Sequence, residues 1–482
     1  MNLCDLFRRT CTRRAADIAA ADETSTLTFG QYLTAARRMA TLLFLKTRRR
    51  HVGIMLPTCK EFVITFFATL LAGKIPVPLN FLLKREELEY IIADSELDTI
   101  VSAHFFEEML AGLVDKPIYL EDLKGRRGVP FPWRFRHHED DTACIIYTSG
   151  TTANPKGVML THRNFLEDLQ GCIDQVHFDH TDIILGVLPM FHSFALATTV
   201  IMPFRIGCKT VYLKRFTAPA VLRMIEEHKV TAILAIASLY RVLVRTVAAE
   251  KGKYDTSSLR LCVAGGEPLP TELSRQSEDA FGMRLLEGYG LTETSPVISV
   301  NSLEEYRLGT AGKPLPNVRV QIANEDGHPM PPGQEGEIWT AGPHVMKGYH
   351  KLPELTNEAM TPDGWFKTGD IGKLDEDGFL SITGRKKELI ISSGENISPN
   401  EIESIIAQHP KVFEAAVVPM PDKTRGEVPK AYVALQPGET CTEMEIKQFC
   451  EERLAKYKVP RAVEFRNELP HGPTGKVLRR AL

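Results

Sequence analysis

Short runs rich in β-branched residues alternate with segments of helix length along most of the chain. This alternation restricts the fold more than any other feature of the sequence, because strands separated by helices favour helical layers packed on largely parallel sheets. An amphipathic segment such as APAVLRMIEEH lies between two of the runs. The runs themselves are VGIMLP, TACIIYT, DIILGVLP, CKTVYL, VTAILAIA and LRLCVAGG. The pattern predicts an α/β fold.

The pattern changes near residue 385. Just before this point, IGKLDEDGFLSIT (371–383) is typical of a β-hairpin with an acidic turn that Gly378 closes. Asp370 and Arg385 stand at nearly equal distances from that turn. We therefore expect their side chains to lie close together at the open end of the hairpin.

The residues after this point predict a small α+β unit. SPNEIESIIAQHP carries a helix start signal, with Ser398 as N-cap, Pro399 at the first helical position and Glu401 completing a capping box. Thr442 and Glu445 repeat the box in TEMEIKQFCEERL. The segments VFEAAVVP and KAYVALQ are typical of strands.

Two domains are expected, because 482 residues are too many for one compact core. We predict a large N-terminal domain of layered α/β subdomains at 1–385 and a small α+β C-terminal domain at 386–482. The joint GRKKEL contains no long linker, so the two domains are expected to meet at a hinge.

Charge and composition argue against several classes of protein. The net charge of −3 gives no electrostatic reason to expect a nucleic-acid partner. The nine cysteines include no C-x-x-C pair, so neither a zinc cluster nor a disulfide framework is indicated, and reduced thiols fit a cytoplasmic location. The segment MNLCDLFRRTCTRRAADIAA lacks the apolar core of a secretory signal. FVITFFATLLAG (62–73) is too short to span a bilayer and predicts a buried helix.

Two charged stretches each allow a functional and an ordinary interpretation. KTRRRH (46–51) can contact anionic lipid, but a solvated helix end that leads into the buried strand VGIML is favoured. RHHEDD (136–141) contains metal-ligand residue types, but its adjacent ligands have no helical or strand spacing toward a common point. We expect a solvated loop there.

The strongest chemical signal is IIYTSGTTANPKG at 145–157. Clustered hydroxyl groups, a flexible glycine and a lysine follow an apolar strand, and such donors suit a chain of phosphates. The loop is not a Walker A motif, because Lys156 precedes Gly157 and a strand-like VML follows. It is expected to join two strands as a flap over phosphates, and the alternative is a polar hairpin with incidental hydroxyls. The expected donors are Thr148, Ser149, Gly150, Thr151, Thr152 and Lys156.

This stretch resembles the phosphate loop of the adenylate-forming (AMP-binding) superfamily, which includes acyl- and aryl-CoA synthetases, luciferases and peptide-synthetase adenylation domains. Five further segments resemble motifs of that family in the family's order, and the similarity covers essentially the whole chain. They are AGGEPL (264–269), EGYGLTETSP (287–296), GWFKTGD (364–370), GRKKELIISSGENI (384–397) and GPTGKVLRR (472–480). The resemblance implies the adenylate-forming enzyme fold.

The resemblance also implies where a nucleotide binds. Tyr289 offers a flat face to adenine, and Gly288 permits close approach of the ligand to the backbone. Asp370 can accept from the ribose hydroxyls, and Arg385 can donate to the sugar or a phosphate. Glu293 is a hard oxygen ligand suited to Mg²⁺. The remaining implied contacts are Gly266, Glu267 and Pro268 beside adenine and Thr292 at a phosphate.

Further roles follow from the resemblance alone. Lys476 matches the lysine that acts at the α-phosphate and would be catalytic together with Thr292, Glu293 and His192. Lys387 matches the hinge position. His192, in LPMFHSFA, would lie between the acyl pocket and the CoA channel, although a histidine there is by itself more often a core residue. The other implied positions are Gly394 in the CoA channel and Phe194, Ala195 and Val297 in the acyl pocket, where ordinary core packing fits equally well.

The implied reaction has two steps. A carboxylate attacks the α-phosphate of ATP to give acyl-AMP and pyrophosphate, and a thiol then displaces AMP. ATP, Mg²⁺ and CoA are therefore implied. The segments around His192 and Glu293 most resemble bacterial ligases for fatty acids of medium to long chain, so a fatty acid is the expected substrate. An aryl or short-chain acid as substrate and acyl carrier protein as acceptor are the alternatives.

A non-catalytic relative that binds a nucleotide or a partner is an alternative from another class. The presence of Lys476, Glu293, Thr292, Asp370 and Lys156 argues against it. Amino-acid adenylation is disfavoured, because no acidic residue matches the aspartate that holds the substrate amine in such domains. The oligomeric state and a peripheral membrane contact stay open.

Overall fold

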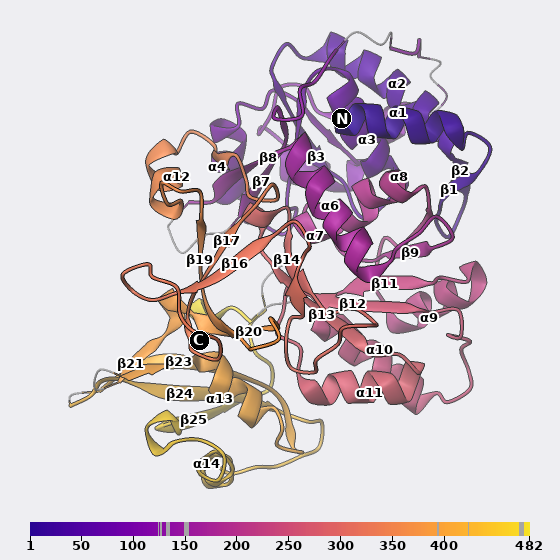
Figure 1. The fold of residues 1–482 in the computed structure, drawn as a ribbon. Coiled ribbons are helices and arrows are strands. Elements are labelled where there is room, and N and C mark those ends of the chain that lie inside the picture. The colour runs from indigo at the N-terminus through magenta and orange to yellow at the C-terminus, as the bar shows by residue number, and fades with distance from the viewer. Residues whose placement is uncertain are drawn as a thin grey trace.

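A nine-stranded sheet runs through the large N-terminal domain of the computed structural model (Figure 1), in the order β15-β14-β13-β12-β11-β9-β10-β1-β2. The model describes the whole chain except residues 124, 126, 127, 132–134, 149–153, 393, 394, 423 and 472–476. Strands β1 and β9 to β13 are parallel, and β2, β14 and β15 join antiparallel at the edges. The strands are β1 (Ile18–Ala21), β2 (Thr26–Thr28), β9 (Ile183–Gly186), β10 (Lys209–Tyr212), β11 (Ala232–Ala235), β12 (Leu261–Gly265), β13 (Leu285–Gly290), β14 (Val297–Val300) and β15 (Lys313–Pro314).

Helices cover both faces of this sheet, which is why its central strands are almost wholly apolar. In Figure 1, α10 and α11 lie on one side and α6 lies on the other. The predicted α/β layering is confirmed. The helices of this region are α6 (His162–Val176), α7 (Ser193–Ala195), α8 (Met202–Ile206), α9 (Ala218–His228), α10 (Ala237–Ala249) and α11 (Thr271–Phe281).

A second parallel sheet, β4-β3-β5-β6, lies at the N-terminal end of the molecule. The predicted buried helix is α3, and α2 ends at Lys46 before β3, as expected for the 46–51 stretch. Within the described residues, no helix combines the length and the apolar character needed to cross a bilayer. The elements are α1 (Leu3–Arg13), α2 (Phe29–Lys46), β3 (His51–Met55), α3 (Lys60–Leu71), β4 (Ile75–Pro78), α4 (Arg85–Asp94), β5 (Ile100–Ser102), α5 (Glu107–Leu110) and β6 (Ile118–Tyr119).

Two antiparallel sheets complete the large domain. TACIIYT forms β7 and pairs antiparallel with β8, because the connection between them is shorter than the dozen residues that a parallel crossover needs. The predicted hairpin 371–383 is confirmed as the turn region between β19 and β20, where Gly378 has a φ of 84°. The elements are β7 (Thr142–Thr148), β8 (Lys156–Thr161), β18 (Gly348–Tyr349), β16 (Arg319–Ala323), β17 (Gly336–Ala341), α12 (Pro353–Ala359), β19 (Phe366–Leu374) and β20 (Leu380–Arg385).

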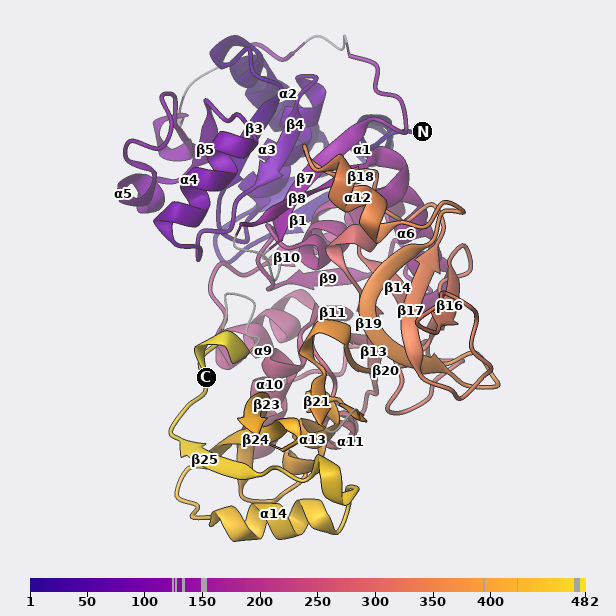
Figure 2. The same cartoon turned by 90° about the vertical axis from the view of Figure 1, so that its left-hand side faces the viewer.

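The small C-terminal domain lies beside the large one (Figure 2) and has its own apolar core around Ile390, Val417, Val433 and Ile446. Its sheet has the order β22-β21-β24-β23, with β25 on β24. The elements are β21 (Ile390–Ser392), β22 (Glu395–Ile397), α13 (Pro399–Ile406), β23 (Val412–Asp422), β24 (Gly426–Leu435), α14 (Glu443–Glu451) and β25 (Ala462–Arg466).

Of the two predicted capping boxes in this domain, one is present and one is wrong. Thr442 and Glu445 exchange both bonds at the start of α14. Ser398 is the N-cap of α13, but its hydroxyl donates to the Thr383 carbonyl in β20, and Glu401 accepts from Lys458 Nζ at 2.7 Å. Tertiary partners therefore replace the local ones at the point where the small domain meets the large one.

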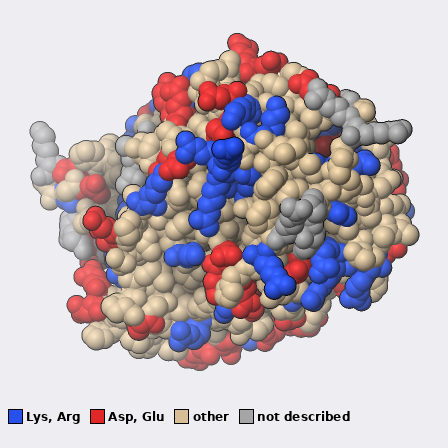
Figure 3. Space-filling model, turned by 90° about the horizontal axis from the view of Figure 1, so that it is seen from above, with Lys and Arg blue, Asp and Glu red and all other residues tan. Residues whose placement is uncertain are grey.

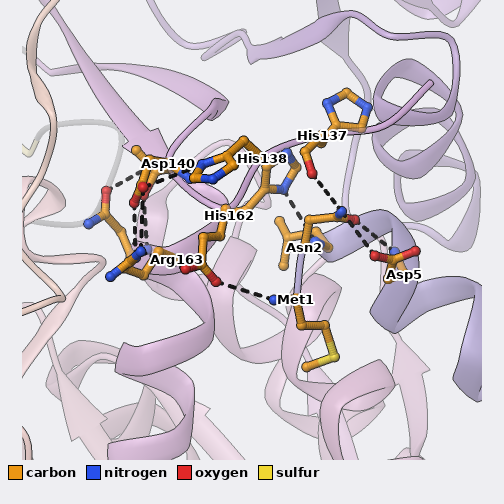
Figure 4. A network of polar contacts seen from close by, with 12 residues as sticks. Met1, Asn2, Asp5, His137, His138, Asp140, His162 and Arg163 are labelled. Carbon is orange, nitrogen blue, oxygen red and sulfur yellow. Dashed lines mark hydrogen bonds and ion pairs between the residues drawn. The ribbon is translucent and has the colours of Figure 1, made fainter.

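The 136–141 stretch is held by polar contacts to α1 and α6 (Figure 4). Arg163 Nε lies 2.9 Å from Asp140 and its Nη2 pairs with Glu139, while Asn2 donates to the His137 carbonyl at 2.9 Å. His138 and Asp140 are exposed, as expected of a solvated loop, but the segment is anchored because Arg163 pairs with two of its carboxylates. Among the described residues, no group of three or more His, Cys, Asp and Glu side chains could hold a metal ion.

Candidate active site

Asp370 and Arg385 face each other across the β19–β20 hairpin, as counting from its turn predicts. Arg385 Nε donates to Asp370 Oδ1 at 2.7 Å, and the Tyr289 hydroxyl donates to Asp370 Oδ2 at 2.7 Å. The Asp370 side chain is 5% exposed and that of Arg385 is 49% exposed. Burial, reinforced by Asp370, raises the pKa of Tyr289, so the phenol stays a donor. Each carboxylate oxygen keeps a second lone pair for a ligand hydroxyl.

The residues expected beside adenine lie at the ends of β12 and β13. Gly266 has a φ of 80°, which turns the chain sharply after β12. Ser238 donates its N–H (2.9 Å) and its hydroxyl (3.3 Å) to the Glu267 carboxylate, which fixes the loop that continues into Pro268. The loop and Tyr289 therefore lie at the same edge of the sheet, where the neighbouring strands β12 and β13 end.

Glu287 lies beside the residues expected at adenine, and the sequence analysis did not single it out. It precedes Tyr289 by two positions on β13, so both side chains point to the same face. Glu287 Oε1 accepts from the Leu269 N–H at 3.4 Å and so joins β13 to the 264–269 loop. Burial raises the pKa of Glu287 to about 8. The two-residue spacing from Tyr289 on a predicted strand could have identified it, because such residues lie on the same face.

Glu287→Gln should change the pH dependence of stability. The folded carboxyl keeps its proton up to about pH 8, whereas the unfolded one loses it near its ordinary value, so the wild type loses stability as the pH rises through this window. Glutamine has no such proton. The melting temperature of the variant relative to wild type should therefore rise between about pH 5 and about pH 8. A constant difference across this range, or the same trend in the exposed control Glu272→Gln, would contradict the assignment.

The expected phosphate loop connects β7 to β8. Thr148 and Lys156 are paired where the two strands meet the loop, so the predicted strand–loop–strand arrangement is confirmed. Ser149, Gly150, Thr151 and Thr152 lie outside the described residues.

Two lysines from different parts of the chain converge beside this loop. Burial lowers the pKa of Lys156 and the nearby charge of Lys387 lowers it further, while Glu293 and Glu358 act in the opposite direction. Lys156 Nζ lies 5.5 Å from the centroid of the Tyr349 ring. A half-buried ammonium group with a second, exposed lysine nearby suits an anionic ligand, such as a phosphate chain.

A tight turn after β13 presents Thr292 and Glu293. Gly290 permits it, because a Cβ there would lie 1.7 Å from the Pro296 carbonyl oxygen. Thr292 Oγ1 and Ser193 Oγ lie 3.2 Å apart, which joins the turn to the segment that carries His192. The turn follows directly from the strand that carries Tyr289.

Glu293, the residue that the resemblance assigns to a magnesium ion, is held by two hydrogen bonds. Its Oε1 accepts from the Tyr349 hydroxyl at 2.9 Å, and its carbonyl accepts from Met346 N–H at 2.8 Å. A single carboxylate fits Mg²⁺, which typically takes one or two carboxylates together with phosphate oxygens and waters. Tyr349 was missed from the sequence, because it is 56 residues from its partner and no motif marks it.

The residues expected around the acyl group lie in or against the main core. His192 is the N-cap of α7, where its Nδ1 accepts from the Phe194 N–H at 3.3 Å. Phe194 and Ala195 are buried core residues, and Val297 packs against the same core. The Phe194 ring lies against Gly265 of β12, close to the adenine-side loop. These positions are compatible with a pocket wall and with core packing alike.

Ion pairs anchor the residues on either side of Lys387. Arg385 pairs with Asp370, and Lys386 Nζ lies 3.1 Å from Glu337 of β17. Glu388 instead pairs with Arg479 near the C-terminus. Lys387 is thus the residue between an anchor on the large domain and an anchor on the small one.

Arg479 connects three parts of the small domain. Besides Glu388, it donates to Asn400 Oδ1 at 2.7 Å and to Glu403 Oε2 at 2.8 Å, both on α13. Lys476 and Gly394 lie outside the described residues. Arg479 was missed from the sequence because its partners are 76 or more residues away.

The chain is similar to known proteins over most of its length. The family described as AMP-binding enzyme matches residues 7–350, and the family described as AMP-binding enzyme C-terminal domain matches residues 401–476. A long-chain-fatty-acid–CoA ligase of Bacillus subtilis is 34% identical over 95% of this chain and 89% of its own length. A 2-succinylbenzoate–CoA ligase of Bacillus licheniformis is 38% identical over 89% of this chain and 88% of its own. The solved structure of an o-succinylbenzoate CoA synthetase from Bacillus subtilis, in complex with ATP and magnesium ion, has a TM-score of 0.90 at 32% identity and covers 99% of this chain and 98% of that chain.

Proposed function

Since the chain belongs to the family of AMP-binding enzymes, we propose that it joins a fatty acid of medium or long chain to CoA through an acyl-adenylate. The family and the adenylate-forming fold predicted from the sequence are confirmed. The chain is an AMP-forming acid–CoA ligase that uses ATP, Mg²⁺ and CoA. The fatty-acid substrate is supported by the Bacillus subtilis ligase, which is similar over nearly the whole chain.

The cluster of Tyr289, Asp370 and Arg385 is the observation that supports the nucleotide role most strongly. Tyr289 and Arg385 both donate to the buried Asp370, and the remaining lone pairs of that carboxylate can accept the ribose hydroxyls. The Tyr289 ring would lie against adenine. Lys156, with Lys387 near it, would donate to the phosphates.

In the first step, an oxygen of the substrate carboxylate forms a bond to the α-phosphorus while the bond to pyrophosphate breaks. The chain's part is to align the two groups and to stabilise the charge that develops on the phosphate oxygens. Thr292 donates to a phosphate oxygen, and Lys476 donates at the α-phosphate. Glu293 would hold Mg²⁺, which supplies further positive charge at the phosphates when bound.

In the second step, the thiol of CoA attacks the acyl carbon and AMP leaves. We place His192 and Gly394 along the path of the thiol. Lys476 serves only the first step, so the small domain moves between the steps by rotation at Lys387. The ion pairs of Arg385 and Glu388 on either side of this residue support that assignment.

An aromatic acid is the second candidate substrate. It is favoured by the Bacillus licheniformis 2-succinylbenzoate–CoA ligase, which has a higher identity to this chain than the fatty-acid ligase of Bacillus subtilis, over a smaller share of the chain. Phe194, Ala195 and Val297 are apolar and would suit either an alkyl chain or a ring.

ATP–pyrophosphate exchange across a panel of acids tests the proposal. We expect exchange with saturated acids between octanoate and stearate, and weak exchange with butyrate and with 2-succinylbenzoate. Product analysis with CoA and acyl carrier protein in competition should give mainly acyl-CoA. The Lys476→Ala variant, purified in the same way, serves as the control for exchange caused by contaminating ligases.

Each other outcome has a definite meaning. Faster exchange with 2-succinylbenzoate than with any fatty acid would show that the substrate is an aromatic acid. Preferred transfer of the acyl group to acyl carrier protein would show that this protein, and not CoA, is the acceptor. No exchange with any carboxylic acid would favour a non-catalytic relative.

A further inference from the structure

We propose that the C-terminal end of α2 is a docking surface for an anionic lipid bilayer. The surface, called here the α2 patch, consists of Arg38, Phe44, Leu45, Lys46, Arg48 and Val129. It lies at the end of the molecule formed by α1, α2 and α3, away from the candidate active site. Figure 3 shows many Lys and Arg side chains gathered on the face at this end.

Apolar side chains project from the α2 patch into solvent. Leu45 is 76% exposed, Val129 is 75% exposed and Phe44 is 48% exposed. Single exposed apolar residues are ordinary on protein surfaces, but these three are neighbours. Thr41, one helical turn before Leu45, donates to the Val129 carbonyl at 2.7 Å. The Phe44 ring lies 5.2 Å from that of Phe131, in the segment that carries Val129.

Cations surround these apolar side chains. Arg38 is on the same face of α2 as Leu45, and it lies against Gly128, the neighbour of Val129. Beyond the helix end, a shallow cavity of about 490 Å³ is lined by Leu45, Lys46, Arg48, Arg49, Asp98 and Lys116. Four of these six side chains are basic, and one is acidic.

Most of this positive charge is not balanced by the protein. Lys46, Arg48 and Arg38 form no ion pair within the described part of the chain, and their side chains are exposed. Arg49 and Lys116 are partly balanced, at 3.7 Å from Glu96 and Asp98 respectively.

An anionic bilayer is the partner that fits this combination. Basic side chains near a negatively charged bilayer attract it, while exposed apolar side chains enter the boundary between headgroups and acyl chains. A purely polar anion, such as inorganic phosphate, would make no use of Leu45, Phe44 and Val129. The sequence favoured a solvated helix end for residues 46–51, and the exposed apolar neighbours in the structure are the reason to revise that interpretation.

Vesicle sedimentation tests the docking surface with the full chain. We expect binding to phosphatidylcholine vesicles that contain phosphatidylglycerol, little binding to phosphatidylcholine alone, and weakening by salt. The double change Lys46→Glu/Arg48→Glu should weaken binding at least about 25-fold, because each cation near the surface is worth about 1 kcal/mol. Leu45→Ser should weaken it about tenfold, since it removes a side chain that the bilayer would bury.

Matched controls separate the patch from general charge and hydrophobicity. Arg223→Glu/Lys251→Glu changes the net charge by the same amount elsewhere, and Phe105→Ser removes a side chain that is 87% exposed, so both should bind as the wild type does. Thermal unfolding verifies that each variant is folded. The readout does not depend on ligase activity, so a failure here is distinct from a failure of the proposed function.

Three results would overturn the proposal. The first is equal binding to both vesicle types, or none to either. The second is a loss with the charge variant but none with Leu45→Ser, which would indicate simple electrostatic adsorption. The third is displacement by inorganic phosphate beyond the effect of sodium chloride at equal ionic strength, which would indicate a site for small anions.

Discussion

Lys476→Ala should abolish formation of the acyl-adenylate and leave thioester formation from supplied acyl-AMP largely intact. In the proposed mechanism, the lysine neutralises charge on the α-phosphate only while that phosphate is being attacked. Removing one such preorganised donor typically costs on the order of a hundredfold to a thousandfold in rate. ATP–pyrophosphate exchange measures the first step, and release of AMP from acyl-AMP in the presence of CoA measures the second.

A control on the same domain makes this result specific. Lys456 is an exposed lysine in the short turn after α14, and Lys456→Ala should leave both steps unchanged. Equal loss of both steps in Lys476→Ala would show that the lysine acts through folding or through binding of the substrates. An unchanged first step would remove Lys476 from the mechanism.

Asp370→Asn should have the second-largest effect, through binding of ATP. The substitution keeps the shape of the side chain but removes the charge that holds Arg385 and one of the two oxygens that accept from Tyr289 and Arg385. Removing a charged acceptor from a hydrogen bond typically costs about 1.5–3 kcal/mol, so kcat/KM for ATP should fall on the order of tenfold to a hundredfold. The KM for the acid should change much less.

Glu376→Gln is the matched control for this change. Glu376 lies in the turn of the same hairpin, is exposed, and forms no ion pair among the described residues, so its loss removes one negative charge at little cost. Asp370→Asn with unchanged kcat/KM for ATP would exclude the carboxylate from the nucleotide site. A parallel fall in kcat/KM for both substrates would indicate a general loss of the fold.

The features that the sequence predicts best are those whose partners lie close together in the chain. The proximity of Asp370 and Arg385 follows from counting residues back from one turn, because the register of a hairpin is fixed by its loop. The Thr442–Glu445 box is likewise complete within four residues. The α/β layering of the large domain follows from the alternation of strands and helices.

Features that depend on distant partners were not predictable in the same way. The Ser398 box fails because the Thr383 carbonyl, fifteen residues earlier in β20, competes for the hydroxyl. Glu293 is bonded by Tyr349, and Glu388 by Arg479, and nothing local in the sequence marks either partner. Only the packed fold brings these side chains together, and a single sequence does not report which remote groups will meet.

Because the two anchored segments around Lys387 are only one residue apart, little conformational entropy is lost when the small domain takes one orientation. Arg385 and Lys386 are held by the large domain and Glu388 by the small one, so the proposed rotation is confined to the backbone of about one residue. Fixing the backbone of one residue costs about 1–2 kcal/mol in entropy. A single hydrogen bond from a charged group contributes about as much, at roughly 1.5–3 kcal/mol. Arg245 makes an exposed contact of this kind across the domains, donating to Gln436 at 3.2 Å and lying 5.0 Å from the Phe413 ring centroid. Together with the bond from Ser398 to the Thr383 carbonyl, this one surface side chain therefore contributes to the orientation of a domain of nearly a hundred residues.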